Sequence, residues 1–99
     1  MAEVPFYLQD YEPRDPEFIK LVCMLREKAQ SAGALDVKTK TLINMALAGV
    51  KHLPEVVTAQ ANIARGLGAT DDEIIDVIRL VCLNDGIPGL TTGIAAFSE

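Results

Sequence analysis

One helix ends and another begins within residues 64–74, which read ARGLGATDDEI. Glycine tolerates the left-handed backbone that terminates many helices, so Gly66 or Gly68 can end the first helix. Thr70 and Glu73 have the Thr-x-x-Glu spacing of a capping box, in which each side chain hydrogen-bonds to the exposed backbone N–H of the other residue. The two aspartates between them add negative charge where the helix dipole favours it. This joint predicts two consecutive helices.

Apolar residues at helical spacing recur along the rest of the chain. They predict helices over about 16–32, 37–50, 54–67, 70–85 and 88–97. In the first of these, one apolar stripe comprises Phe18, Leu21, Val22, Leu25, Ala29 and Ala32. Ile19 and Cys23 form a second stripe that flanks it. No stretch alternates as a strand would, so the prediction is an all-α fold of five helices.

Residues 1–14 differ in composition from the rest of the chain. They contain Pro5 and Pro13, which discourage a helix, and the aromatic residues Phe6, Tyr7 and Tyr11. We therefore expect an N-terminal arm that packs on its own subunit or on a neighbour. Residues 15–99 are predicted to form a single helical domain.

The composition indicates that some helix faces are covered by other subunits. The chain has 99 residues, of which 49% are hydrophobic, and its mean hydropathy is +0.22. This is more apolar material than one small core needs, so we expect a homo-oligomer. The net charge is −5 and the Lys and Arg residues are scattered, which argues against nucleic-acid binding. No signal peptide or bilayer-spanning run is present, so we expect a cytoplasmic protein without membrane contact.

The two cysteines, Cys23 and Cys82, lie far apart and match neither a disulfide framework nor a zinc pattern. Each lies in an apolar helical stripe, which favours buried packing over reactivity, although either remains a candidate thiol. With a single histidine in the chain, we expect no metal site and no cofactor.

Residues 35–97 resemble the carboxymuconolactone decarboxylase and alkylhydroperoxidase D-like superfamily. The resemblance is carried by LDVKTKTLI at 35–43, MALA at 45–48, the GATDDEI joint at 68–74 and NDGIPGL at 84–90. Each piece is weak alone, but their order and spacing together are specific. The resemblance implies an all-α fold of helical hairpins that assembles into trimers or hexamers.

The peroxidase branch of this superfamily uses a glutamate, two cysteines in CxxC spacing and a histidine. By resemblance, the glutamate position falls on Thr41, the cysteine positions on Leu53 and Val56, and the histidine position on Gln60. None of these side chains can serve as thiolate or base near neutral pH. The resemblance thus argues against thiol peroxidase activity at the usual place.

The decarboxylase branch relies on histidine and carboxylate for proton transfer. By resemblance, the candidates here are His52 and Glu55, which flank the start of the helix predicted from residue 54. Such a histidine can polarise a lactone or carboxylate substrate, or transfer a proton. The alternative is an exposed histidine with no catalytic role.

Three functions remain open. The first is small-molecule binding in a pocket lined by Thr41, Asn44 and Gln60, with Leu53 and Val56 at the family's site, or non-redox lactone or carboxylate chemistry by His52. The second is a non-catalytic oligomeric scaffold, in which the same polar residues satisfy one another inside an interface. The third is an atypical thiol-dependent peroxidase that uses Cys82 or Cys23.

Overall fold

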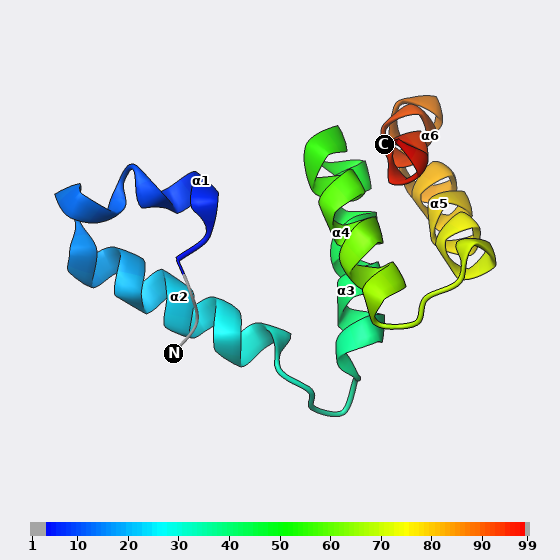
Figure 1. The fold of residues 1–99 in the computed structure, drawn as a ribbon. Coiled ribbons are helices and arrows are strands. Elements are labelled where there is room, and N and C mark those ends of the chain that lie inside the picture. The colour runs from blue at the N-terminus through cyan, green and yellow to red at the C-terminus, as the bar shows by residue number, and fades with distance from the viewer. Residues whose placement is uncertain (1–3, 99) are drawn as a thin grey trace. The chain divides into compact units, whose positions relative to one another are not determined.

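A computed structural model describes residues 4–98, and this part of the chain is helical with no strand (Figure 1). The elements are α1 (Phe6–Gln9), η1 (Glu12–Arg14), α2 (Pro16–Gln30), α3 (Val37–Val50), α4 (Pro54–Gly66), α5 (Asp71–Asp85), α6 (Ile87–Gly93) and η2 (Ile94–Phe97), where η marks a 3₁₀ helix. The all-α prediction is confirmed. The chain forms two compact units, residues 1–33 and 34–99. The predicted division after residue 14 falls inside the first unit and stays a prediction.

The first unit contains short helices in the segment where the sequence predicted none. Pro5 is the N-cap of α1 and Pro13 lies in the first turn of η1. A proline is tolerated at these positions because the backbone N–H it lacks would have no partner within the helix. The Arg26 guanidinium lies 6.0 Å from the centre of the Tyr7 ring, so α1 contacts α2.

The two apolar stripes of α2 differ in burial. The residues buried on this helix are Ile19 and Cys23, which belong to the flanking stripe. Three members of the main stripe, Phe18, Leu21 and Leu25, are 54%, 62% and 68% exposed. Within its own unit, α2 therefore buries the narrower stripe and leaves the wider one uncovered.

The second unit contains the core. α3 and α5 run in the same direction, and α4 runs against α3 (Figure 1). The buried cluster comprises Met45, Ala48, Val57, Ala61, Ile74, Ile78 and Ala96. At α6, the backbone replaces side chains in the packing: a Cβ at Gly93 would lie 3.3 Å from Ile78 Cγ2. The backbone of α6 therefore lies close to α5 at this glycine.

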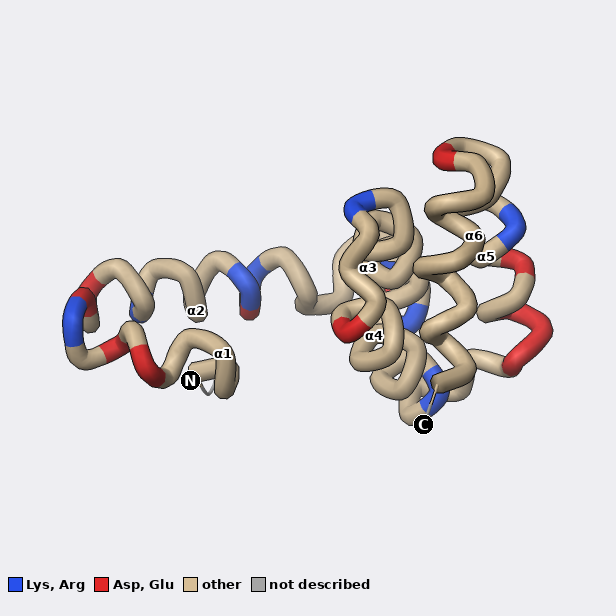
Figure 2. The backbone as a smooth tube through the Cα atoms, turned by 90° about the horizontal axis from the view of Figure 1, so that it is seen from above, with Lys and Arg blue, Asp and Glu red and all other residues tan. Residues whose placement is uncertain are grey.

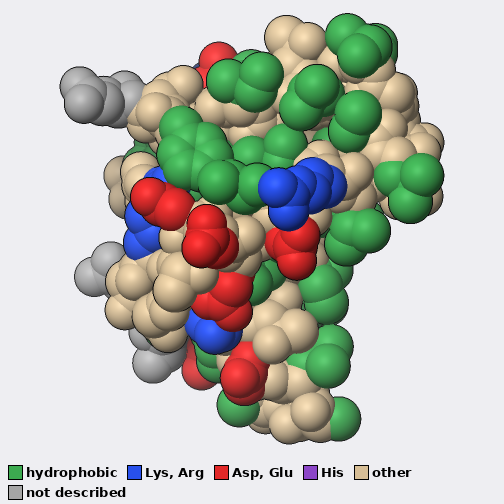
Figure 3. Space-filling model, turned by 90° about the vertical axis from the view of Figure 1, so that its right-hand side faces the viewer, with side chains coloured by type: hydrophobic (Ala, Val, Ile, Leu, Met, Phe, Trp, Pro, Cys, Tyr) green, Lys and Arg blue, Asp and Glu red, His purple; other side chains and the backbone are tan. Residues whose placement is uncertain are grey.

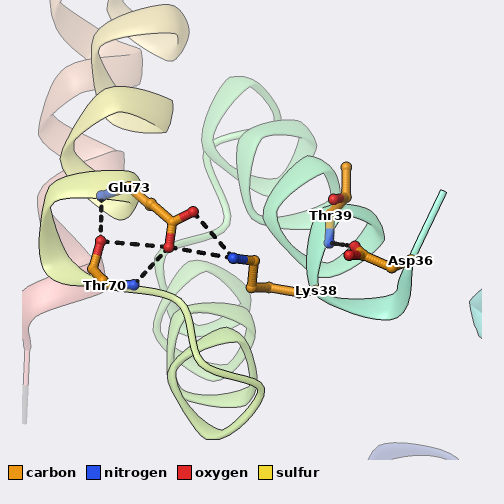
Figure 4. Close-up of polar contacts among 5 residues, drawn as sticks. All are labelled: Asp36, Lys38, Thr39, Thr70 and Glu73. Atoms are coloured by element: carbon orange, nitrogen blue, oxygen red, sulfur yellow. Dashed lines mark hydrogen bonds and ion pairs between the residues drawn. The ribbon is translucent and has the colours of Figure 1, made fainter.

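The joint between α4 and α5 has the predicted structure. Gly68 has φ 98°, and the N–H of Ala69 donates to the Ala64 carbonyl at 2.9 Å. Thr70 Oγ1 accepts from the Glu73 N–H at 3.1 Å, and Glu73 Oε1 accepts from the Thr70 N–H at 2.9 Å (Figure 4). The capping box is thus complete.

The same glutamate connects α5 to α3. Lys38 Nζ lies 3.1 Å from Glu73 Oε2, and Asp36 caps α3 by accepting from the Thr39 N–H at 2.8 Å (Figure 4). Hydrogen bonds from the Thr70 backbone and from Lys38 lower the pKa of Glu73. Hydrogen bonds from Thr39, first from its side chain and then from its backbone, lower the pKa of Asp36. The Lys38–Glu73 ion pair therefore connects the N-terminal ends of α3 and α5.

Charge is distributed unevenly along the described chain. Three acidic residues occupy the first turn of α5, whereas Lys and Arg are scattered (Figure 2). No helix within residues 4–98 is long and apolar enough to span a bilayer.

Candidate functional site

The residues predicted to line a pocket lie on α3, on α4 and just before α4: Thr41, Asn44, Leu53, Val56 and Gln60. Thr41 is buried, and its hydroxyl donates to the Val37 carbonyl one turn earlier at 2.8 Å. Leu53 and Val56 are 43% and 41% exposed. The Thr41 hydrogen is therefore used inside its own helix, and a pocket formed by these five residues stays a prediction.

Gln60 differs from its neighbours in this group. Among the buried side-chain nitrogen and oxygen atoms of residues 4–98, its Oε1 is the one without a hydrogen-bond partner. An unsatisfied buried acceptor costs about 1–3 kcal/mol. The Gln60 amide is therefore a candidate acceptor for a donor group on a ligand or on a second subunit.

His52 holds an unusual backbone conformation at the end of α3. Its φ is 59°, and no other non-glycine residue in the described part of the chain has a positive φ. The N–H of Leu53 donates to the Ala48 carbonyl at 3.0 Å, the bond of a Schellman C-cap. α4 ends in the same way with Gly68 at the equivalent position. A side chain in this conformation costs about 1–2 kcal/mol, and such strain often marks a functional residue.

The imidazole of His52 is paired with Asp85, the last residue of α5. Its Nε2 lies 2.6 Å from Asp85 Oδ2, and the side chains are 52% and 25% exposed. Glu55, the carboxylate suggested by proximity in sequence, is exposed. A carboxylate accepts hydrogen bonds, so the neutral imidazole carries its hydrogen on Nε2 and keeps a lone pair on Nδ1. The contact with Asp85 thus uses one ring nitrogen of His52 and leaves the other, Nδ1, outside this pair.

The backbone of α6 supports this pair at Gly89. A Cβ at this position would lie 2.8 Å from both Cβ and Oδ2 of Asp85, and 3.0 Å from Val81 Cγ1. Since real Cβ atoms do not approach so closely, only glycine fits without moving the carboxylate. Gly89 thus leaves the space in which Asp85 meets His52.

An apolar cleft lies between the last turns of α3 and α5. Its volume is about 280 Å³. The lining residues are Ala46, Leu47, Val50, Leu80, Val81 and Asn84. Val50 and Asn84 lie two positions before His52 and one before Asp85, but neither His52 nor Asp85 lines the cleft. The cleft and the His52–Asp85 contact thus both belong to the C-terminal ends of α3 and α5.

The sequence analysis identified His52 but missed Asp85, which it treated as part of a helix end. The two residues are separated by 33 positions, and no local motif connects them. The pairing became visible only once the C-terminal ends of α3 and α5 were placed together.

The two cysteines differ in burial. Cys23 is buried on α2, and Cys82 is half-buried on α5. Within residues 4–98, no group of three or more His, Cys, Asp or Glu side chains is placed to hold a metal ion.

Comparison with known proteins tests the resemblance. The model of the carboxymuconolactone decarboxylase family matches residues 16–99. Two proteins of Methanocaldococcus jannaschii described as uncharacterized, MJ1511 and MJ0742, are each 30% identical to the chain. The first match covers 85% of this chain and 78% of MJ1511, and the second covers 77% of this chain and 74% of MJ0742.

A solved structure agrees with these matches. The crystal structure of apo-lpg0406, a carboxymuconolactone decarboxylase family protein from Legionella pneumophila, superposes with a TM-score of 0.83 at 31% identity. The superposition covers 91% of this chain and 80% of that one. The predicted resemblance is confirmed, and the chain belongs to the carboxymuconolactone decarboxylase family.

Proposed function

We propose that this protein binds a small molecule in the cleft between α3 and α5 and catalyses a non-redox proton transfer with His52. In this proposal, Nδ1 of His52 accepts a proton from the substrate, and Asp85 stabilises the imidazolium that forms. The observation that carries the proposal is the 2.6 Å contact between His52 Nε2 and Asp85 Oδ2 beside an apolar cleft.

The backbone of His52 supports a role for its side chain. Glycine or asparagine would end α3 at lower cost, because these residues adopt a positive φ more readily. A histidine kept at φ 59° is explained if the imidazole is needed where it meets Asp85.

The experiment is a turnover screen of lactones and keto acids with the wild-type chain and three variants. His52→Gly suits the backbone and removes the base, and should lower kcat/KM by about 10²-fold or more. Asp85→Asn should give a smaller loss, because the base remains but loses its orientation. Asp72→Asn, which removes a carboxylate in the first turn of α5, is the matched control and should be unchanged.

Two outcomes would contradict the assignment. Equal turnover by the wild type and His52→Gly would exclude His52 as the base. A loss of activity in Glu55→Gln but not in Asp85→Asn would show that the sequence neighbour, rather than the contact seen here, assists the histidine.

We also propose that the protein is a homo-oligomer, a trimer or a hexamer. A separate observation favours this: α4 and the residues directly before and after it carry an uncovered apolar stripe at alternating spacings of three and four. Leu53, Val56, Ile63 and Leu67 are 43%, 41%, 51% and 44% exposed, and Gln60 lies at the centre of the stripe. This is the spacing that helices use to pack against one another.

Other faces add to the exposed apolar surface. Hydrophobic side chains gather on the face of the molecule that Figure 3 shows. Leu83 on α5 and Ile87 on α6 are 78% and 68% exposed. Uncovered apolar residues in such number favour contacts with further copies of the chain. An oligomer of this kind also accommodates the scaffold hypothesis, in which assembly itself is the function.

Light scattering after size exclusion tests self-association. Ile63→Glu should reduce the mass to that of one chain, because it places a charge in the apolar stripe. Asn62→Glu changes the exposed neighbouring residue and should leave the assembly intact. A wild-type chain that is monomeric at micromolar concentration would refute the proposal.

The thiol hypothesis is tested by alkylation of the native protein. Rapid labelling of Cys82 or Cys23, together with thiol-dependent hydroperoxide turnover, would support an atypical peroxidase. Equally slow labelling of both would exclude it.

A further inference from the structure

The uncovered stripe of α4 is nearly symmetric in sequence about Gln60. Its apolar members are Leu53, Val56, Ile63 and Leu67, all of them exposed within the chain. A leucine lies seven positions before Gln60 and another seven after it, and a β-branched residue lies four before and three after it. A helix face with this symmetry matches a second copy of itself laid antiparallel, with Gln60 at the two-fold axis.

The charges of α4 follow the same symmetry. Glu55 and Arg65 are the two ionisable residues of this helix, and each lies five positions from Gln60. Antiparallel pairing about Gln60 therefore brings Glu55 level, along the helix axis, with Arg65 of the second copy, whereas parallel pairing would bring like charges level. The antiparallel arrangement also places each positive helix N-terminus beside a negative C-terminus. Charge complementarity thus favours the antiparallel pair.

The amide of Gln60 lacks a partner in the single chain. Its Oε1 is buried and accepts no hydrogen bond, although the residue as a whole is half-buried. A primary amide carries both donors and an acceptor, so two Gln60 amides that meet at a two-fold axis can form two reciprocal hydrogen bonds. Side chains commonly change rotamer at an interface, and the amide need only rotate toward the axis to form these bonds. The second copy would thus contribute the donor that the single chain does not supply.

We infer that two copies of the chain pair antiparallel through α4, and that reciprocal hydrogen bonds between their Gln60 amides fix the register. This inference rests on the self-association proposed above. A two-fold contact occurs in a hexamer but not in a trimer with a single three-fold axis, so the inference favours the hexamer. The pair forms first and the other uncovered faces join the pairs, so Ile63→Glu should leave single chains, as expected above.

A chain with both Leu53→Cys and Leu67→Cys tests the direction of pairing. The two leucines are 43% and 44% exposed, so their replacement need not disturb folding. They lie 14 positions apart, about 21 Å along a helix, which is too far for a disulfide within one chain. The native protein is oxidised with copper–phenanthroline, and mass spectrometry of its peptides identifies the joined positions, so Cys23 and Cys82 stay in place.

Antiparallel pairing predicts which positions are joined. We expect disulfides between positions 53 and 67 to exceed those between identical positions by about tenfold or more. Asn62→Cys, at an exposed position outside the stripe, is the control and should form no disulfide with its own copy. An excess of disulfides between identical positions would show parallel packing and overturn the inference. The absence of any disulfide between two copies at positions 53 and 67 would overturn it as well.

Gln60→Leu, introduced into the same double-cysteine chain, tests the amide. It removes the polar pair and keeps a side chain of similar length, so association should be at least as tight but the register less specific. The excess of disulfides between positions 53 and 67 should fall to less than about threefold. An unchanged excess would show that the apolar residues alone set the direction, and would contradict the role of Gln60.

This experiment and the light-scattering measurement fail independently. If the wild type self-associates and no disulfide joins positions 53 and 67, the homo-oligomer stands and the α4 pair falls. If the wild type is monomeric, both fall. If the disulfide forms in a protein with the mass of two chains, the α4 pair stands and the hexamer falls.

Discussion

Replacing His52 by glycine and by alanine separates the cost of its backbone from the contribution of its imidazole. Both variants lose the contact with Asp85, so they differ only in the presence of a Cβ at φ 59°. A residue with a Cβ pays about 1–2 kcal/mol for this conformation. Glycine avoids that cost but gains about 0.4–1 kcal/mol of additional freedom in the unfolded chain. We therefore expect His52→Gly to be more stable than His52→Ala by about 1 kcal/mol.

The free energy of unfolding of each variant relative to the wild type depends on the lost His52–Asp85 contact and on the backbone strain. The His52–Asp85 contact is half-exposed on the histidine side, so it contributes about 0.2–1 kcal/mol to stability. Relief of the backbone strain offsets this loss in His52→Gly but not in His52→Ala. The glycine variant should therefore unfold close to the wild type, within about 0.5 kcal/mol, while losing the proposed activity.

Urea unfolding followed by far-UV circular dichroism measures these differences. All variants must be compared at one protein concentration, because self-association would shift the apparent stability. The free energy of unfolding of a small domain falls by about 1 kcal/mol per molar urea, so the urea midpoints of His52→Gly and His52→Ala should differ by roughly 1 M. Ala59→Gly is the control at an exposed position of α4, where the backbone is helical. There glycine should lower the free energy of unfolding by about 1 kcal/mol relative to alanine. If His52→Ala is as stable as His52→Gly, the left-handed conformation is not strained and the argument from strain is wrong.

Three further predictions follow from the second unit. Gly89→Ala should destabilise the fold by about 1–3 kcal/mol, because its Cβ would lie 2.8 Å from Asp85 Cβ; unfolding at the wild-type midpoint would contradict this. Thr70→Ala should cost about 1 kcal/mol in the same assay, since it removes the acceptor for the Glu73 N–H at 3.1 Å. Folding lowers the pKa of Glu73 from its usual 4.5 and of Asp36 from its usual 3.8. The stability that these two carboxylates contribute should be constant at neutral pH and decline as the pH falls through 4.5 and then 3.8. In Glu73→Gln, the decline should begin at lower pH.

Local rules predicted the helix ends well. The capping box at Thr70, the N-cap at Asp36 and the glycine termination at Gly68 each depend on residues within a few positions of one another. Such signals can be identified from sequence because both partners of each hydrogen bond belong to one short segment.

The exposed faces could not be assigned in the same way. Helical spacing identified the stripe that contains Phe18, Leu21 and Leu25 but could not show what covers it. Periodicity gives the direction of an apolar face, and it does not distinguish a face against the chain's own core from a face that meets another subunit. The exposure of this stripe within its own unit is consistent with the proposed homo-oligomer.

The candidate site shows the same division between local and long-range information. His52 was found because it is the one histidine of the chain. Its strained backbone was not predicted, because a C-cap position is most often taken by glycine. Asp85 was not predicted either, because its contact depends on how the ends of two helices meet, and that geometry is absent from the spacing of residues along the chain.

The resemblance aligned the thiol positions of the peroxidase branch with Leu53 and Val56, at the start of α4. His52 lies directly before them, but its left-handed backbone places the imidazole against the end of α5. The positive φ of His52 thus goes together with a contact between the α3–α4 turn and Asp85 at the end of α5. The loss of thiol residues at the aligned positions consequently says nothing about chemistry at the neighbouring α3–α5 cleft. For this chain, turnover by His52→Gly and His52→Ala compared with the wild type tests whether the protein is catalytic. The absence of cysteines at the aligned positions does not answer that question.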